Sequence, residues 1–189
     1  ENRGVGLYLD DVNLHQTNVA ASHISYNAGG GVVVRAGNVR NIQISGCDIE
    51  GNMGGPDAPA TANVLIDSRG GQAGTAEVAI VGCTIQHTHT AADSANVRFI
   101  GQDAADRRWG HITIADNVLS DVQVNIDVQY ARGVSITGNT VWKGVQHDLR
   151  VRDSSHVVVG PNVFDRNPQY QDQKPANNGL LLSDCTDVT

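Results

Sequence analysis

Charged and amide side chains recur at alternate positions along three apolar segments, near residues 96–100, 125–129 and 148–152. This period of two is typical of β-strands, whose side chains point alternately to opposite faces. With the apolar side chains inward, the polar ones share one outer face. The pattern predicts the following outward set on three adjacent strands: Asn96, Arg98, Asn125, Asp127, Gln129, Asp148, Arg150 and Arg152.

Arginine and aspartate in this alternation suit chemistry on an acidic sugar. A guanidinium binds a carboxylate through two parallel hydrogen bonds, and proton transfer needs a positioned acid or base. Asp127 falls between two arginines, so we expect a depressed pKa for its carboxyl. That suits a base or an electrostatic partner better than a general acid. The candidate catalytic residues are Asp127, Arg150, Arg98 and Asp148.

Loops beside these strands add further polar and aromatic residues, and long loops on a rigid scaffold commonly carry binding residues. The candidate substrate-binding residues are Asn96, Asn125, Gln129, Arg152, His147, Lys143, Trp109, His87 and His89. We assign no metal ligands, because no third ligand stands at a fixed spacing from His87 and His89. Ordinary cross-strand charge pairing also explains an alternation of arginine and aspartate on an exposed sheet.

A sequence repeat supplies the elements that position these residues. The pattern apolar-x-apolar-x-x-Asn-x-apolar recurs with its asparagine at Asn117, Asn139 and Asn162, and two earlier copies carry Cys47 and Cys83 in that slot. Another apolar strand precedes each copy, beginning near residues 7, 32, 64, 97, 126, 149 and 180. One such unit cannot bury its apolar side alone, whereas a stack of units can.

The repeat predicts an all-β fold, a right-handed parallel β-helix with three sheets and about six complete coils. Coils stack at about 4.8 Å, so the amides of Asn117, Asn139 and Asn162 should form a ladder. Cys47 and Cys83 would lie within disulfide reach, although buried free thiols fit the same slot. A leucine-rich repeat is disfavoured, because leucine never stands three positions before the first apolar residue and no helical segment follows.

The composition fits strands joined by tight turns and argues against several functional classes. The chain has 189 residues, 21 glycines and a net charge of −7, which gives no support for nucleic-acid binding. No apolar run approaches the roughly 20 residues that span a bilayer. We expect a single β-helix domain over residues 1–189, as an excerpt of a longer solenoid that is uncapped at both ends. No pattern indicates an oligomeric state.

The asparagine-bend repeats resemble the right-handed parallel β-helix superfamily typified by pectate lyases, over nearly the whole chain. This resemblance implies a polysaccharide partner and a secreted, cell-surface or periplasmic location. It also implies a substrate cleft on the outer face of the sheet that contains the strands near residues 97, 126 and 149. Calcium, used by pectate lyases, would need clustered carboxylates without interleaved arginines. We therefore assign no cofactor.

Two classes of function remain open. The first is an enzyme on an acidic, uronate-containing polysaccharide, as a lyase or C5-epimerase that moves a proton α to a carboxylate. A glycoside hydrolase on the same fold would need two carboxyl groups with separated pKa values, for which Asp127 and Asp148 are the candidates. The second class is a non-catalytic, glycan-binding or tailspike-like β-helix. Long loops and polar residues over the same coils favour the first class.

Overall fold

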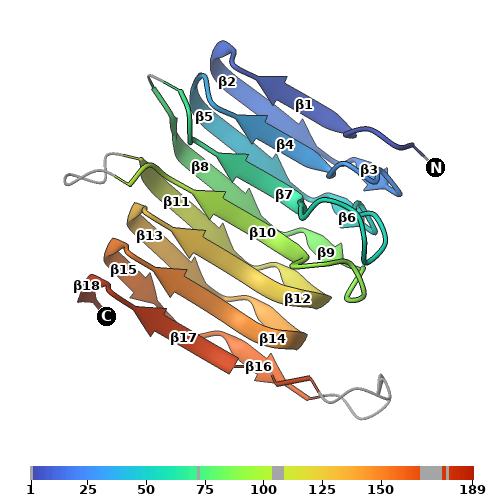
Figure 1. Cartoon of the computed structure of the whole chain (residues 1–189). Helices are drawn as coiled ribbons and strands as arrows, with labels where there is room; N and C mark the ends of the chain where they lie inside the picture. Colours follow the sequence, from blue (N-terminus) through green and yellow to red (C-terminus); the bar gives the residue numbers. More distant parts are fainter. Residues whose placement is uncertain (1, 72, 104–108, 167–175, 178) are drawn as a thin grey trace.

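The computed structural model describes residues 2–71, 73–103, 109–166, 176–177 and 179–189. Across these ranges the regular structure consists of 18 β-strands and no helix. The strands pair in parallel in two sheets, an arrangement consistent with a β-helix solenoid (Figure 1). Within the part of the chain so described, no helix is long and apolar enough to cross a membrane.

The smaller sheet has seven strands, one from each turn of the chain. Its members, in chain order, are β2 (Asn13–Ala20), β5 (Asn38–Ser45), β8 (Thr75–Val81), β11 (Gly110–Ala115), β13 (Arg132–Thr137), β15 (Ser155–Val159) and β18 (Thr186–Val188). Ile44, Ile80, Ile114 and Ile136 occupy one register position on consecutive strands. Such stacking of identical side chains follows from the sequence repeat.

The larger sheet has eleven strands in two rows. One row contains β1 (Leu7–Asp10), β4 (Val32–Arg35), β7 (Ala62–Asp67), β10 (Ala95–Ile100), β12 (Val118–Gln129), β14 (Thr140–Arg152) and β17 (Gly179–Ser183). The other row contains the short strands β3 (His23–Ser25), β6 (Asp48–Glu50), β9 (Thr84–Gln86) and β16 (Val163–Asp165), with the first residues of β12 and β14.

The two rows are one sheet because β12 and β14 keep pairing where the chain turns a corner. Asp121 and Lys143 lie at this corner with φ of 66° and 55°, in the left-handed region, and the β12–β14 register shifts between Val122 and Val124. The prediction of three separate sheets therefore differs from the structure, which joins two of them. The predicted inward column is confirmed: Val97 pairs with Ile126, and Ile126 with Leu149.

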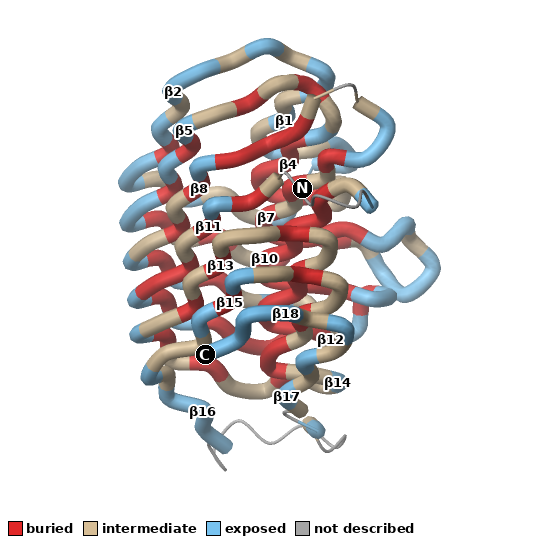
Figure 2. The backbone as a smooth tube through the Cα atoms, turned by 90° about the vertical axis from the view of Figure 1, so that its left-hand side faces the viewer, coloured by how far each residue is buried: buried red, intermediate tan, exposed pale blue. Residues whose placement is uncertain are grey.

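Aliphatic side chains fill the interior of the stack. Ile80, Ile114, Leu119 and Val128 are fully buried. Figure 2 shows buried segments one above another through successive turns, with exposed residues at the corners and at both ends of the stack. This continuous core holds the outer faces of β10, β12 and β14 in fixed positions.

The predicted asparagine ladder is confirmed at the bend that follows the seven-stranded sheet. The Nδ2 of Asn117 donates to Oδ1 of Asn139 at 3.0 Å, and the Nδ2 of Asn139 donates to Oδ1 of Asn162 at 3.0 Å. Cys47 and Cys83 continue the column, with the amide of Cys47 3.5 Å from the Cys83 Sγ. Both cysteines are buried free thiols, so the free-thiol interpretation is the correct one.

Replacing Asn139 with alanine should lower the free energy of unfolding by about 2 kcal/mol, since buried donors of Asn117 lose their acceptor. Asn139 is fully buried, and its Oδ1 accepts from both the amide N and the Nδ2 of Asn117. Urea denaturation measures the change. Asn13→Ala is the matched control: the Asn13 side chain is exposed and accepts one bond from Asn38. Equal losses in the two variants would contradict a stabilising ladder.

Candidate functional site

Arg98, Asp127 and Arg150 lie side by side on β10, β12 and β14, as the sequence pattern predicted. The Nε of Arg98 donates to Oδ2 of Asp127 at 2.8 Å. Arg150 donates from Nε to Oδ1 at 2.9 Å and from Nη2 to Oδ2 at 2.8 Å, a bidentate pair. Gln129 adds a further donor to Oδ2 at 3.0 Å. Both carboxylate oxygens of Asp127 are therefore occupied by donors.

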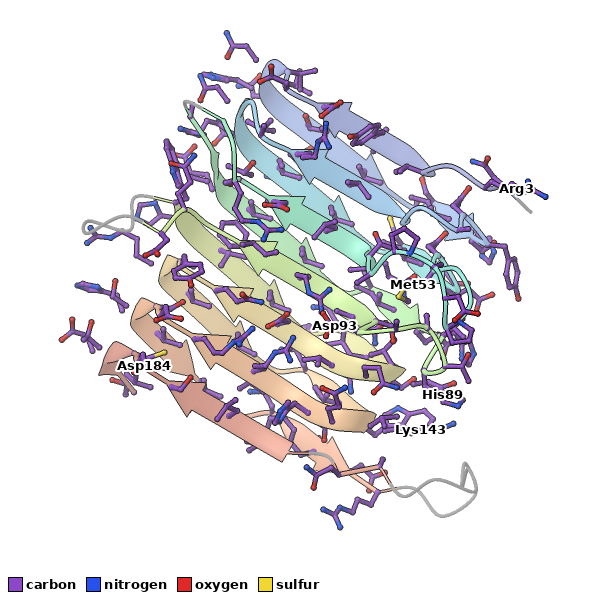
Figure 3. The ribbon with its side chains drawn as sticks, viewed as in Figure 1. Arg3, Met53, His89, Asp93, Lys143 and Asp184 are labelled. Carbon is purple, nitrogen blue, oxygen red and sulfur yellow. The ribbon has the colours of Figure 1, made fainter. Side chains whose placement is uncertain are left out.

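This ion-pair network is buried. Asp127 is 0% exposed and Arg98 is 5% exposed. Asp93, whose side chain is half exposed, closes the network from the loop before β10, with Oδ2 3.1 Å from Arg98 Nη2 and Oδ1 3.4 Å from Arg150 Nη2. Asp93 lies over this region in Figure 3. The network thus resembles a closed charge cluster more than an open catalytic pair.

The predicted depression of the Asp127 pKa agrees with the structure. Burial alone would raise the pKa of this carboxyl, but the hydrogen bonds and charges of Arg150 and Arg98 outweigh burial and lower it. Because its oxygens are already saturated by donors, the carboxylate has no free lone pair facing solvent. Asp127 is placed to orient the two arginines and is poorly placed to remove a proton.

Asn96, Asn125 and Asp148 do not face outward, which corrects the prediction from strand alternation. All three are fully buried. Asn96 donates to Oδ1 of Asn125 at 2.7 Å, and Asn125 donates to Oδ1 of Asp148 at 2.9 Å. They end a second asparagine ladder that begins at the other end of the stack and runs through Asn2, Asn27, Asn52, Asn63, Asn96, Asn125 and Asp148.

Asp148 is the only carboxylate in this second ladder among the described residues. Its Oδ1 accepts from Nδ2 of Asn125 and from the amide of Gly144, each at 2.9 Å, whereas its Oδ2 is buried and has no hydrogen-bond partner among the residues that the structure describes. Burial raises the pKa of this carboxyl to about 6, although the bonds from Asn125 and Gly144 oppose the shift. Asp148 is therefore a buried acid rather than an exposed catalytic residue.

His87, His89 and Lys143 converge on Asp121, a residue that the sequence pattern did not indicate. The Nδ1 of His89 lies 3.0 Å and the Nζ of Lys143 lies 2.8 Å from Asp121 Oδ1, and the Nδ1 of His87 contacts Oδ2. Figure 3 shows His89 and Lys143 close together at this corner.

The positions of this Asp121 cluster follow from the register. His87, Asp121 and Lys143 each come one residue after the paired positions Gln86, Ser120 and Trp142, and all three have positive φ. Burial raises the pKa of Asp121, but Lys143 and the two histidines outweigh it and lower the value. The cluster gathers the side chains of His87, His89 and Lys143 around Asp121 at the corner of β12 and β14.

His147 and Arg152 lie on β14 on either side of Arg150. The Nδ1 of His147 and the Nε of Arg152 are buried and have no hydrogen-bond partner in the described part of the chain. Burial, together with the charge of Arg150, lowers the pKa of His147. Its imidazole is therefore uncharged at neutral pH. The half-buried side chains of His147 and Arg152 thus lie on either side of the ion-pair network.

Trp109 does not join the site. It immediately precedes β11 of the seven-stranded sheet, packs against the core, and lies beneath Arg40, whose guanidinium carbon is 4.9 Å from the ring centroid. This cation–π contact occupies one face of the indole. The predicted role of Trp109 in substrate binding therefore has no support from its position.

No family model, no curated protein and no solved structure matches the chain. The fold is consistent with a parallel β-solenoid, and the site is a partly buried polar face of arginines and aspartates on β10, β12 and β14. What this face does must be argued from its own chemistry.

Proposed function

We propose that this protein is a pectate lyase-like, right-handed parallel β-helix of about six coils that binds an acidic polysaccharide across β10, β12 and β14. In this proposal it acts as a lyase or C5-epimerase on uronate residues, in a secreted, cell-surface or periplasmic setting. The observation that carries the proposal is Arg152, a half-buried arginine whose guanidinium has no hydrogen-bond or ion-pair partner among the described residues. A guanidinium without an anionic partner is suited to bind a substrate carboxylate.

The local charge supports an anionic ligand. Arg98, Arg150, Arg152 and Lys143 gather over three adjacent strands of a chain whose net charge is −7. Guanidinium groups bind carboxylates in a fixed bidentate geometry. Asp127 holds Arg98 and Arg150 rigidly, so these arginines lose little side-chain entropy when a ligand binds. Because Asp127 and Asp93 pair with Arg98 and Arg150, and Asp121 pairs with Lys143, Arg152 is the arginine left to bind a uronate carboxylate.

The structure changes the residue that we propose as the base. Asp127 is saturated by donors, whereas His147 is half buried and has a lowered pKa. In a lyase, an uncharged imidazole would accept the proton α to the substrate carboxylate, and the electron pair of that C–H bond would form a C4–C5 double bond. The C4–O bond would break with its electron pair on the leaving oxygen, which would take a proton from water. We assign proton acceptance to Nε2, because Nδ1 is buried. Arg152 would hold the carboxylate and stabilise the enolate-like intermediate.

A glycoside hydrolase receives less support. Its two carboxyl groups must reach the glycosidic bond and differ in pKa. The carboxyls of Asp127 and Asp148 do have shifts in opposite directions, but both residues are 0% exposed. A sugar could not contact either carboxyl without displacing the arginine network or the asparagine ladder.

Replacing His147 with alanine should lower the rate of unsaturated-product formation on a uronate polysaccharide by at least about 100-fold, the usual contribution of a general base. Arg152→Ala should mainly raise KM. The assay follows ultraviolet absorbance and reducing ends together over a panel of uronate polysaccharides. The control is Arg35→Ala, which should leave both signals unchanged. Arg35 is exposed, pairs with Asp10, and lies on β4, two coils before β10.

Several outcomes separate the alternatives. Reducing ends without absorbance would indicate a hydrolase and contradict the role of His147. Neither signal, with exchange of the C5 hydrogen into solvent, would indicate an epimerase. Binding of polyuronate that Arg152→Ala weakens, without turnover of any kind, would leave a glycan-binding scaffold. No binding to any uronate polymer would overturn the proposal.

A further inference from the structure

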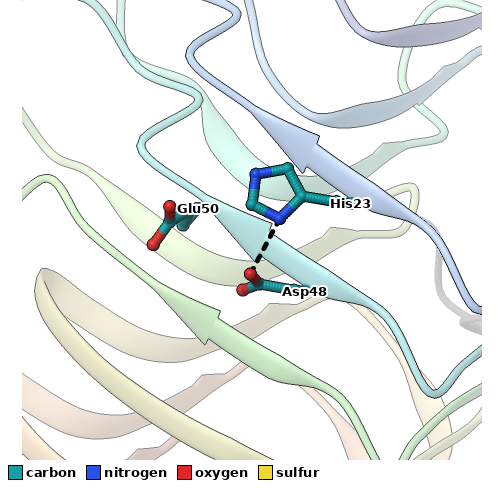
Figure 4. Close-up of side chains that lie close together, drawn as sticks. All are labelled: His23, Asp48 and Glu50. Carbon is teal, nitrogen blue, oxygen red and sulfur yellow. Dashed lines mark ion pairs between the residues drawn. The ribbon is translucent and has the colours of Figure 1, made fainter.

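A second group of ligating side chains lies on the row of short strands, away from Arg152 and the ion-pair network. His23 is on β3, and Asp48 and Glu50 are on β6 (Figure 4). One ligand atom from each of the three residues lies within 4.8 Å of the others. None of the three is part of the face proposed for polysaccharide.

The sheet itself brings these three side chains together. His23 pairs with Asp48 in the register, and the next outward position pairs Ser25 with Glu50. Neighbouring strands lie about 4.8 Å apart and alternate residues share a face, so the four side chains form a small square on the outer surface. The Nδ1 of His23 already lies 2.9 Å from Oδ2 of Asp48.

Hydrogen bonds to the outer atoms orient two of the ligands. The Nε2 of His23 lies 2.8 Å from the hydroxyl of Ser25, and the Nε2 of Gln86 donates to Oε2 of Glu50 at 3.2 Å. A ligating histidine usually donates its second ring N–H to an oxygen, which fixes the tautomer that leaves the other nitrogen as the ligand. With Ser25 as that acceptor, His23 Nδ1 would be the nitrogen left to ligate an ion, beside Oδ2 of Asp48.

We propose that His23, Asp48 and Glu50 bind one divalent transition-metal ion of the zinc class. One imidazole nitrogen with carboxylate oxygens suits Zn²⁺, Cu²⁺ or Ni²⁺, whereas Ca²⁺ takes six to eight oxygen ligands. The side chains of His23 and Asp48 are 58% and 44% exposed. Three protein ligands on an open surface leave at least one coordination position for water, as in zinc sites that are not purely structural.

The site is tested by titrating the full chain with Zn²⁺ alone in a calorimeter. We expect one ion per chain, and a loss of at least tenfold in affinity for His23→Ala and for Glu50→Gln. Ser25→Ala, which removes the acceptor of the ring N–H, should weaken binding about tenfold. The control is His15→Ala, because His15 is an exposed histidine on β2. The Zn²⁺ affinity of this variant should match that of the unchanged chain.

Cobalt provides a second readout that does not depend on affinity. Co²⁺ in this site should give visible d–d bands of four- or five-coordination in the unchanged chain and in His15→Ala, and the weak spectrum of the hydrated ion in His23→Ala. Circular dichroism will show that the variants, all at partly or fully exposed positions, stay folded. Equal Zn²⁺ affinity in His23→Ala, absence of saturable binding, or a preference for Ca²⁺ over Zn²⁺ would each overturn the proposal.

Discussion

Replacing Asp127 with alanine is expected to lower the free energy of unfolding by about 3–5 kcal/mol, the cost of leaving buried charge without its partner. The carboxylate is 0% exposed and holds Arg98, itself 5% exposed, and Arg150. Without it, two neighbouring guanidinium groups would repel each other in a site that solvent reaches poorly. Asp93 alone, half exposed at the edge of the network, cannot replace the lost contacts.

Urea denaturation at pH 7 measures this change, with Asp10→Ala as the matched control. Asp10 and Arg35 form the same cross-strand pair on β1 and β4, but on the exposed surface, where such pairs contribute little. We expect a small change in the control. A small loss in Asp127→Ala as well would show that the network is not a buried structural unit, and would reopen a direct catalytic role for Asp127.

The pH dependence of this effect has a definite sign. Asp127 has a pKa lowered below 3.8 in the folded chain, so its ionised form binds more favourably there than in the unfolded chain. The contribution to stability is complete above the unfolded value and is lost as the pH falls through the folded pKa. The difference between Asp127→Ala and the unchanged chain should therefore shrink below about pH 4.

The parts of the fold that depend on the repeat could be predicted from the sequence. Val97, Ile126 and Leu149 stand at equal positions in successive units, and they pair as expected. The ladder at Asn117 and Asn139 was predictable for the same reason, since one residue type recurs in one slot of the pattern. Arg98, Asp127 and Arg150 form their contacts because register alone aligns them.

The errors lie at the corner where β12 and β14 turn. Strict alternation places Asn96 and Asn125 on the exposed outer face, but both side chains are fully buried. Their amides instead bond to the next ladder member and to the carbonyls of Ser120 and Trp142 at the corner. Their recurrence in one column was a signal for a ladder, as it was at Asn117. Asp121 had no such signal, because an aspartate with positive φ is not distinguishable in sequence from any loop aspartate.

Asp148 ends that second ladder with a carboxylate, and Asp148→Asn should stabilise the chain at pH 7. An asparagine could accept from Asn125 and Gly144 through Oδ1 as Asp148 does. Its Nδ2 would replace Oδ2, which has no partner within the described part of the chain. Asn96 and Asn125 donate to the carbonyls of Ser120 and Trp142. Ser120, Trp142 and Asp165 occupy the same position on successive coils. By the same pattern, Nδ2 of an asparagine at position 148 would donate to the carbonyl of Asp165.

The size and pH range of the gain follow from the raised pKa of Asp148. The value rises from 3.8 to about 6 on folding, and each unit corresponds to about 1.4 kcal/mol, so ionised Asp148 costs the folded state about 3 kcal/mol above pH 6. The folded state binds the proton more tightly, so stability falls as the pH rises from 3.8 to 6. Asp148→Asn removes that fall. We expect a gain of about 2–3 kcal/mol at pH 7 and little at pH 4.

Thermal and urea unfolding at the two pH values test this expectation, with Asn96→Asp as the reciprocal variant. Asn96 lies in the middle of the same ladder and donates to the Ser120 carbonyl. A carboxylate at this position would face the Ser120 carbonyl oxygen and could not donate to it or to Asn125, as the Nδ2 of Asn96 does. Asn96→Asp should therefore destabilise the chain at pH 7, and less at pH 4. A gain in Asp148→Asn that is equal at both pH values would mean that packing, not the buried charge, limits stability at this coil. A loss at pH 7 would mean that the ionised carboxylate has an acceptor role that asparagine cannot fill, because the second oxygen of Asp148 would then have to bind a donor such as a buried water.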